Sequence, residues 1–150
     1  MELKVIPVIQ VLIAVLLMVM FSQLWPGLIL DWPAHKQVAL LLFILAIFVG
    51  ISALISFTMH KTTVNPIKPE TTTTIVSSGI YSFSRNPMYL AMLISLISVA
   101  YYLQHVTSLP VLLIFIAYMT RFQIIPEEKI LTKKFGQQYV DYQNKVRRWL

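Results

Sequence analysis

The chain has 150 residues, of which 57% are hydrophobic and only 12% charged, and its mean hydropathy of +0.73 lies outside the range of soluble globular domains. It contains no cysteine, which excludes disulfides, thiolate metal sites and cysteine nucleophiles. The formal net charge of +6 is accompanied by no nucleic-acid recognition motif, so we expect an integral membrane protein that binds no nucleic acid.

Four apolar segments are candidates to cross a bilayer, which takes roughly 20 residues per helix. They cover residues 5–24, 38–59, 88–103 and 109–125. The first two carry no charge, the third is short, and the fourth is apolar except near its end. The sequence therefore predicts an all-α fold with about four transmembrane helices in a single membrane domain, residues 1–150.

The positions of Lys and Arg predict the orientation of these helices. With four spans, the N-terminus, the connection 60–87 and the C-terminal tail share one side of the membrane. That side holds every Lys and Arg except Lys36. Because basic residues are concentrated on the cytoplasmic side of membrane proteins, we expect both termini and the long connection to be cytoplasmic.

The polar residues divide the domain into two halves. Residues 1–59 predict a plain helical hairpin that serves as a scaffold, with prolines and tryptophans in its outer connection. Residues 60–150 contain the unusual polar residues, so we expect the cofactor-binding and catalytic half there. The connection 60–87 has Pro-containing pairs and a threonine run that favour irregular backbone. It is either an ordered cover over a site or a flexible linker.

The tail after the fourth span has the pattern of an amphipathic interfacial helix. Pro126 suits a first helical position, and Glu127 and Glu128 complement the positive end of the helix dipole. A glycine in mid-helix, Gly136, costs about 1 kcal/mol relative to alanine and suggests close approach to another element or a ligand. A helix of this kind also commonly lies on anionic lipid. Its apolar residues recur at spacings of four and three: Leu131, Phe135, Tyr139, Tyr142, Val146 and Trp149.

Two polar clusters are expected at the same membrane boundary if the third and fourth spans pack antiparallel. Ionisable groups at that depth are usually paired with each other or with a ligand. Carboxylates suit ribose hydroxyls or an ammonium group, a guanidinium suits a carboxylate, and aromatic faces suit a purine or a sulfonium. Those are the needs of S-adenosylmethionine. The clusters are Tyr81, Arg85, Asn86 and Tyr89, and Arg121, Gln123, Glu127 and Glu128.

The order of these residues resembles the isoprenylcysteine carboxyl methyltransferase family, which belongs with the membrane phospholipid methyltransferases. The resemblance covers residues 60–150. It rests on Gly79-x-Tyr81-x-x-x-Arg85-Asn86-Pro87-Met88-Tyr89, then on Glu127-Glu128-x-x-Leu131-x-x-x-Phe135-Gly136-x-x-Tyr139-x-x-Tyr142, and on Val146-x-Arg148.

The resemblance implies a membrane-embedded methyltransferase without a Rossmann domain, which agrees with the lack of a G-x-G-x-x-G motif. It implies S-adenosylmethionine as cofactor, S-adenosylhomocysteine as product, and no metal. The acceptor is expected to be a carboxylate on a lipid-anchored or lipophilic molecule. The residues expected to hold the cofactor are Thr73, Thr74, Ile75, Val76, Tyr81, Arg85, Asn86, Pro87, Met88, Tyr89 and Glu127.

Two departures from the family pattern leave the acceptor open. Asn86 stands where many members have histidine, and an arginine that holds substrate in eukaryotic members falls at Gln123, two residues after Arg121. We expect Arg121 and Glu128 to be the catalytic residues, with Glu128 accepting the proton if the acceptor is an amine.

Alternatives to this reading remain open. N-methylation of an aminophospholipid is the second enzymatic reading. A four-helix transporter, which lacks a carboxylate in its first three spans, or a membrane scaffold are the others. We expect the cofactor to enter under residues 71–85 and the acceptor to enter laterally between the third and fourth spans.

Overall fold

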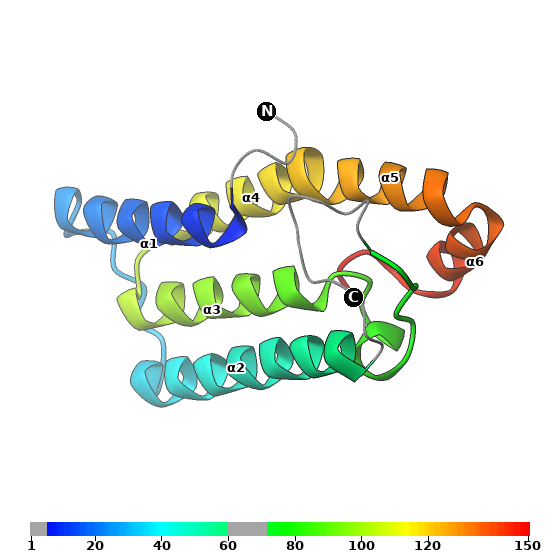
Figure 1. Ribbon diagram of the computed structural model, residues 1–150. Coiled ribbons are helices and arrows are strands. Elements are labelled where there is room, and N and C mark those ends of the chain that lie inside the picture. Colours follow the sequence, from blue (N-terminus) through cyan, green and yellow to red (C-terminus); the bar gives the residue numbers. More distant parts are fainter. Residues whose placement is uncertain (1–5, 60–71) are drawn as a thin grey trace.

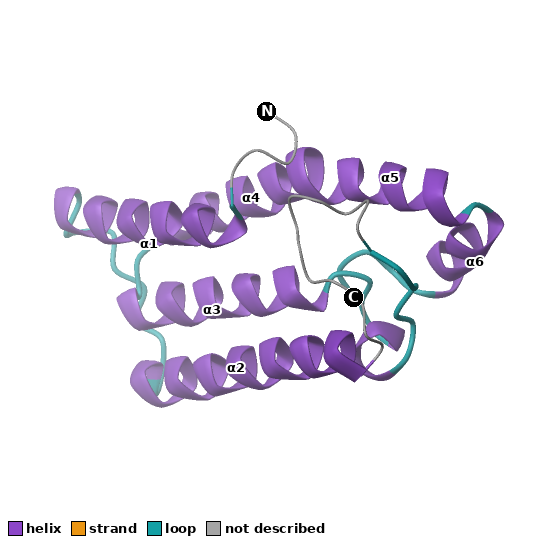
Figure 2. Ribbon diagram, viewed as in Figure 1, coloured by secondary structure: helices purple, strands orange, loops and turns teal. Residues whose placement is uncertain are grey.

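Helices make up the regular structure of the computed structural model, which describes residues 6–59 and 72–150, and no strand occurs among these residues (Figure 2). Four long helical units run side by side (Figure 1). This arrangement confirms the predicted all-α membrane fold. In chain order the helices are α1 (Pro7–Leu24), α2 (His35–Met59), the short η2 (Gly79–Ser82), α3 (Pro87–Leu103), α4 (Ser108–Tyr118), the π-helical η3 (Met119–Ile124), α5 (Ile125–Phe135) and α6 (Gln137–Lys145).

The fourth span is longer than the sequence predicts. We expected it to end at residue 125 and a separate helix to begin at Pro126, but α4, η3 and α5 form one continuous helix of 28 residues. Proline has no N–H for the carbonyl four residues earlier and normally breaks a helix. Here the wider π turn directly before Pro126 accommodates that missing bond, so the helix continues.

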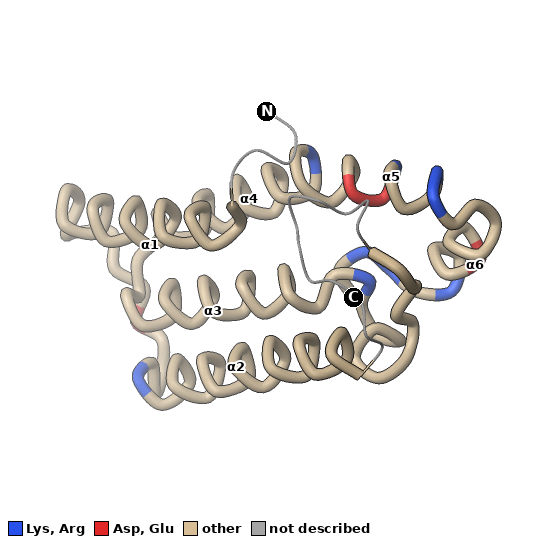
Figure 3. Tube along the Cα trace, viewed as in Figure 1, with Lys and Arg blue, Asp and Glu red and all other residues tan. Residues whose placement is uncertain are grey.

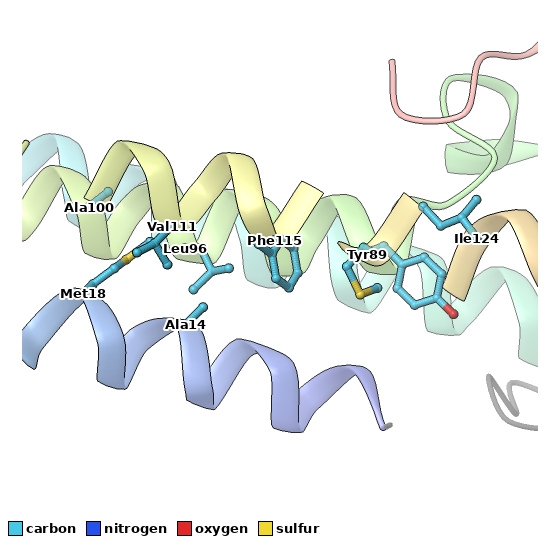
Figure 4. Packing of buried hydrophobic residues seen from close by; sticks show 9 residues of the cluster. Ala14, Met18, Tyr89, Leu96, Ala100, Val111, Phe115 and Ile124 are labelled. Atoms are coloured by element: carbon cyan, nitrogen blue, oxygen red, sulfur yellow. The ribbon is translucent and has the colours of Figure 1, made fainter. Parts of the chain in front are cut away.

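The helix α3 lies in the middle of the bundle (Figure 1). On one side it packs against α2, and on the other against α1 and α4. Met18 of α1, Leu96 of α3 and Phe115 of α4 meet in the largest buried cluster (Figure 4). The predicted hairpin of residues 1–59 is therefore not a unit of two helices packed on each other, because α1 and α2 pack on opposite sides of α3.

Small residues bring α2 and α3 close together. Ala39, Ala46 and Ala53 recur at every seventh position of α2, and all three are buried. A Cβ atom added at Gly50 would lie 3.6 Å from the Cβ of Ala91. The Ser98 hydroxyl donates a hydrogen bond to the Ala39 carbonyl at 2.7 Å. Lipid offers no hydrophobic drive for helix association, so close packing and hydrogen bonds of this kind hold the pair together.

The two connections at one end of the bundle, which we call the far end, are joined by backbone hydrogen bonds. Ile29 and His105 form an antiparallel bridge, flanked by bonds from Leu30 N–H to the Gln104 carbonyl at 2.6 Å and from Val106 N–H to the Leu28 carbonyl at 3.1 Å. The buried His105 donates from Nε2 to the Trp25 carbonyl at 2.8 Å. These contacts fix the α1–α2 and α3–α4 connections to each other.

The C-terminal tail forms two helices rather than the single helix that the pattern predicts. Gly136, with φ of 56° and ψ of −132°, ends α5, and α6 then turns away from it (Figure 1). A Cβ added at Gly136 would meet no atom within 4 Å. The glycine is therefore required by its backbone conformation and not by close packing. After Lys145 the chain is extended, so Val146 and Trp149 lie outside the helix.

Replacing Gly136 with alanine is expected to destabilise the tail. A non-glycine residue at this φ and ψ carries about 1–3 kcal/mol of strain. Thermal unfolding in detergent should show this loss for Gly136→Ala. Gly27→Ala is the matched control, because Gly27 also has nothing within 4 Å of an added Cβ and does not have a left-handed backbone. Equal stability of the two variants would show that the turn tolerates a side chain.

Candidate functional site

A cavity of about 200 Å³ lies at the end of the bundle opposite the far end. Its walls come from the start of α1, the end of α2, residues 72–76, η2, the start of α3, α5 and α6. Much of the lining is apolar. The aromatic side chains in it are Phe57, Tyr81, Tyr89, Phe135, Tyr139 and Tyr142.

Most of the residues predicted to hold a cofactor line this one cavity, although they come from distant parts of the chain. Glu128, predicted to be catalytic, also lines it. Thr73 and Pro87 are adjacent to lining residues but are not part of the wall. The predicted residues in the wall are Thr74, Ile75, Val76, Tyr81, Arg85, Asn86, Met88, Tyr89 and Glu127.

The structure does not place Arg121 at the cavity. Arg121 is exposed on the π-helical segment, where its guanidinium lies 5.5 Å from the centre of the Phe122 ring. Gln123, two residues later, is buried and donates from Nε2 to the Tyr89 hydroxyl at 3.2 Å. The two side chains thus occupy different faces of the helix, and Gln123 is the one that reaches the wall residues.

Glu127 is held by a short chain of hydrogen bonds. The Tyr89 hydroxyl lies 2.9 Å and 3.0 Å from the two oxygens of the Glu127 carboxylate and donates to it. Gln123 in turn supports the Tyr89 hydroxyl. Because a carboxylate has about four acceptor positions, this arrangement orients Glu127 and leaves it able to accept hydrogen bonds from hydroxyl groups in the cavity.

Glu128 lies between two arginines. Arg85 Nη2 donates to Glu128 Oε1 at 2.6 Å, and Arg148 donates from Nε to Oε1 at 3.0 Å and from Nη2 to Oε2 at 2.7 Å. The side chains of Arg85 and Glu128 are each only 9% exposed, whereas that of Arg148 is 36% exposed. The two-pronged contact with Arg148 is the strong geometry for an arginine–carboxylate pair.

These charged groups also bind the C-terminal segment, residues 137–149, across the cavity. Arg85 Nη1 donates to the carbonyls of Gln143 and Val146 at 2.8 Å and 2.9 Å. The Asn86 amide donates to the Arg148 carbonyl at 2.9 Å, and the Tyr142 hydroxyl donates to the Tyr81 carbonyl at 2.7 Å. The segment is therefore fastened to the residues just before α3.

The buried tyrosines act as hydrogen-bond donors at ordinary pH. Burial raises the pKa of the Tyr81 hydroxyl well above its usual value, and the same cause raises the pKa of the Tyr139 and Tyr142 hydroxyls. Their phenols therefore stay protonated and can donate to a bound molecule or to backbone carbonyls.

Several wall residues were not identified as site residues from the sequence. Tyr139 and Tyr142 were assigned only to the apolar face of a surface helix, and that face turns inward over the cavity. Phe57, at the end of α2, packs edge-on against Tyr81 with ring centres 5.2 Å apart. Nothing in its apolar run distinguishes it from its neighbours. For Arg148, the spacing Val146-x-Arg148 was the available signal.

Substituting Asn86 is expected to loosen the C-terminal segment. Asn86 precedes α3 but makes no side-chain cap hydrogen bond, so its printed side-chain partner is the Arg148 carbonyl. Asn86→Ala should lower the free energy of unfolding by about 1 kcal/mol through loss of that bond. It should also speed hydrogen exchange in α6. Asn86→His retains a donor and should be affected less. Unchanged exchange in α6 for Asn86→Ala would contradict this role.

Comparison with known proteins agrees with this site. A sequence model of the phospholipid methyltransferase family matches residues 35–138, which is more than half of the chain and includes most of the cavity-lining residues. An uncharacterized protein from Haemophilus influenzae is 41% identical over 63 residues, which are 42% of this chain and all of that protein. No solved structure matches the chain.

The family match has a consequence for the whole chain. It contains α2, α3, the continuous fourth helix and the start of α6, so it covers the helices that build the cavity as well as the residues that line it. The chain therefore belongs to the phospholipid methyltransferase family and is a membrane methyltransferase.

Proposed function

We propose that the protein uses S-adenosylmethionine to methylate a carboxylate on a lipid-anchored or lipophilic acceptor, as isoprenylcysteine carboxyl methyltransferases do. One observation carries the choice of a carboxylate. Neither carboxyl group of the cavity wall is placed as an unengaged base, since Glu128 is held by two guanidiniums and Glu127 accepts from Tyr89. No histidine or further carboxylate among the described residues lines the cavity. A carboxylate acceptor is already an anion and needs no base.

The residues of the cavity suit S-adenosylmethionine chemically. Aromatic rings can stack on the adenine or face the sulfonium, and Glu127 can accept hydrogen bonds from the ribose hydroxyls. Arg85 lines the cavity, and its buried Nε has no hydrogen-bond partner among the described residues. A buried donor without a partner is costly, and a ligand carboxylate would satisfy it. When bound, S-adenosylmethionine supplies an electrophilic methyl group.

In this proposal the chain contributes alignment and exclusion of water. The methyl group passes to an acceptor carboxylate oxygen and forms an ester, so no proton has to be removed. Glu127, oriented by Tyr89, fixes one end of the site, and Arg85 and Glu128 keep the C-terminal segment over it. Holding two reactants in line and away from water can lower the barrier by several kcal/mol.

The acceptor is proposed to enter between α1 and α2 rather than between α3 and α4. The cavity is lined by Pro7 and Val8 at the start of α1, Phe57 at the end of α2, and Met88 and Met92 of α3. No described residue of α4 lines it, and α4 packs against α3 in the buried core. An apolar chain in the bilayer would thus reach the cavity between the ends of α1 and α2.

The cavity is proposed to face the cytoplasm. Figure 3 shows Lys and Arg along α5, around α6 and beside the start of α3, whereas the far end carries Lys36 at the start of α2. This distribution supports a cytoplasmic cavity by the positive-inside rule. Locating a C-terminal fluorescent or alkaline-phosphatase fusion tests it.

N-methylation of an aminophospholipid is the second candidate, and the family match favours it. An amine acceptor must lose a proton. Glu127 would then be the proton acceptor, because the two arginines that donate to Glu128 stabilise its charged form and make it a weak base.

The nature of the methylated bond decides between the two candidates. Membranes that contain the chain should be incubated with methyl-labelled S-adenosylmethionine and the products treated with alkali. Release of the label as methanol indicates an ester and supports carboxyl methylation. Label that stays in phospholipid after alkali supports N-methylation. Membranes without the chain are the control, and absence of any chain-dependent label would refute S-adenosylmethionine as the cofactor.

A further inference from the structure

A second hollow lies on the outer side of α5, away from the cavity. It is an open groove of about 500 Å³ between α5 and the residues at and beyond the end of α6. Lys129, Lys133, Gln143 and Arg148 line it together with Glu128, which also lines the cavity. The arginine–carboxylate contact therefore forms the wall between the two hollows.

The length of the fourth helix places this groove at the level of the lipid headgroups. Its 28 residues, at about 1.5 Å each, extend over roughly 42 Å. The hydrocarbon core of a bilayer is about 30 Å thick, or roughly 20 helical residues. Measured from Ser108, the helix leaves the core near Glu128. Lys129 and Lys133 then lie just outside it, where phospholipid phosphates are.

The groove carries excess positive charge. Lys129 and Lys133 are exposed one helical turn apart, and neither forms an ion pair with a described residue. Like charges at this spacing repel each other. The only carboxylate in the groove, Glu128, already has guanidinium donors on both oxygens. An anion in the groove would relieve the repulsion between the two lysines.

We propose that this groove binds the phosphate of an anionic phospholipid headgroup, with Lys129 and Lys133 as its main ligands and Arg148 beside them. The site goes beyond the proposed methyl transfer, since it lies outside the cavity and its lipid is not the methyl acceptor. Charge complementarity together with the depth of the groove favours a membrane lipid over a soluble anion. A bound headgroup would also lie against the arginine that fastens the C-terminal segment.

Lipid binding to two matched variants tests the proposal. The full chain in a neutral detergent is titrated with phosphatidylglycerol and, separately, with phosphatidylcholine, and native mass spectrometry gives the dissociation constant of the first lipid bound. The groove variant is Lys129→Gln with Lys133→Gln. The control is Lys145→Gln with Arg147→Gln, which removes the same charge from exposed positions outside the groove at the same end of the molecule.

The wild-type chain should prefer phosphatidylglycerol, and the groove variant should lose at least fivefold in affinity for it, because each lysine near lipid phosphate contributes about a fivefold factor. The control should change by less than about twofold. Equal losses in both variants would indicate diffuse surface attraction and overturn the proposal. So would equal wild-type affinity for both lipids. Inorganic phosphate that displaces the lipid, where chloride at the same ionic strength does not, would identify a soluble anion as the occupant.

Discussion

Glu128→Gln is expected to lower the free energy of unfolding by about 3 kcal/mol. The substitution leaves the Arg85 guanidinium, whose side chain is 9% exposed, without its charged partner. Removing one member of a buried ion pair typically costs 3–5 kcal/mol. The lower end applies because Arg148 is partly exposed and water screens its charge. Chemical unfolding of the purified protein in detergent measures the change.

A matched control is available for this substitution. Asp141 is an exposed carboxylate that accepts a hydrogen bond from Gln137 at 2.9 Å, so Asp141→Asn should change stability by less than about 0.5 kcal/mol. If Glu128→Gln unfolds like the wild-type chain yet fails to methylate an amine, Glu128 is the proton acceptor that the sequence first suggested. In that case its contact with the arginines is not its main role.

Glu127→Gln is expected to weaken binding of S-adenosylhomocysteine by about 10- to 150-fold. A hydrogen bond to a charged group is worth roughly 1.5–3 kcal/mol, and each 1.4 kcal/mol is a tenfold change in affinity. Stability should change little, because glutamine keeps an oxygen that can accept from Tyr89. Isothermal titration calorimetry in detergent measures the affinity.

Thr73→Val separates a cofactor effect from a general one. Thr73 is exposed and lies beside the cavity wall without being part of it, so Thr73→Val should bind S-adenosylhomocysteine within about threefold of wild type. Wild-type affinity in Glu127→Gln would remove this carboxylate from the cofactor site. The acceptor would then become its partner.

The membrane fold follows from composition, but the packing of its helices does not. Long uncharged runs can only be membrane helices in a chain of this hydropathy, and the structure has them. Which helix occupies the centre depends on side-chain shape along the helices. The alanines at every seventh position of α2 carry that information, yet they are as apolar as the lipid-facing residues beside them. Likewise, Pro126 normally ends a helix, and only the π turn before it shows that this helix continues.

The candidate site was accessible from the sequence because its residues are grouped in two short polar stretches at one membrane boundary. Asn86, Tyr89 and Glu127 all line the cavity as expected. Arg121 was a wrong placement, since which face of a helix a side chain occupies depends on a rotation that a local π turn alters. The inward face of α6 could not be predicted either. An amphipathic pattern shows that a face is apolar but not whether lipid or protein covers it.

The hydrogen bonds at the far end determine where this molecule can open. There, the connections before α2 and before α4 are joined backbone to backbone, with a buried histidine beneath them. At the cavity end, the contacts that close the structure are made by side chains, chiefly those of Arg85, Asn86 and Tyr142. Side-chain contacts can exchange for water or ligand without disturbing a helix. Separation of the helices should therefore pivot about the far end, and an acceptor carrying a long apolar chain can be admitted and released at the cavity end while the opposite surface of the protein stays closed to ions.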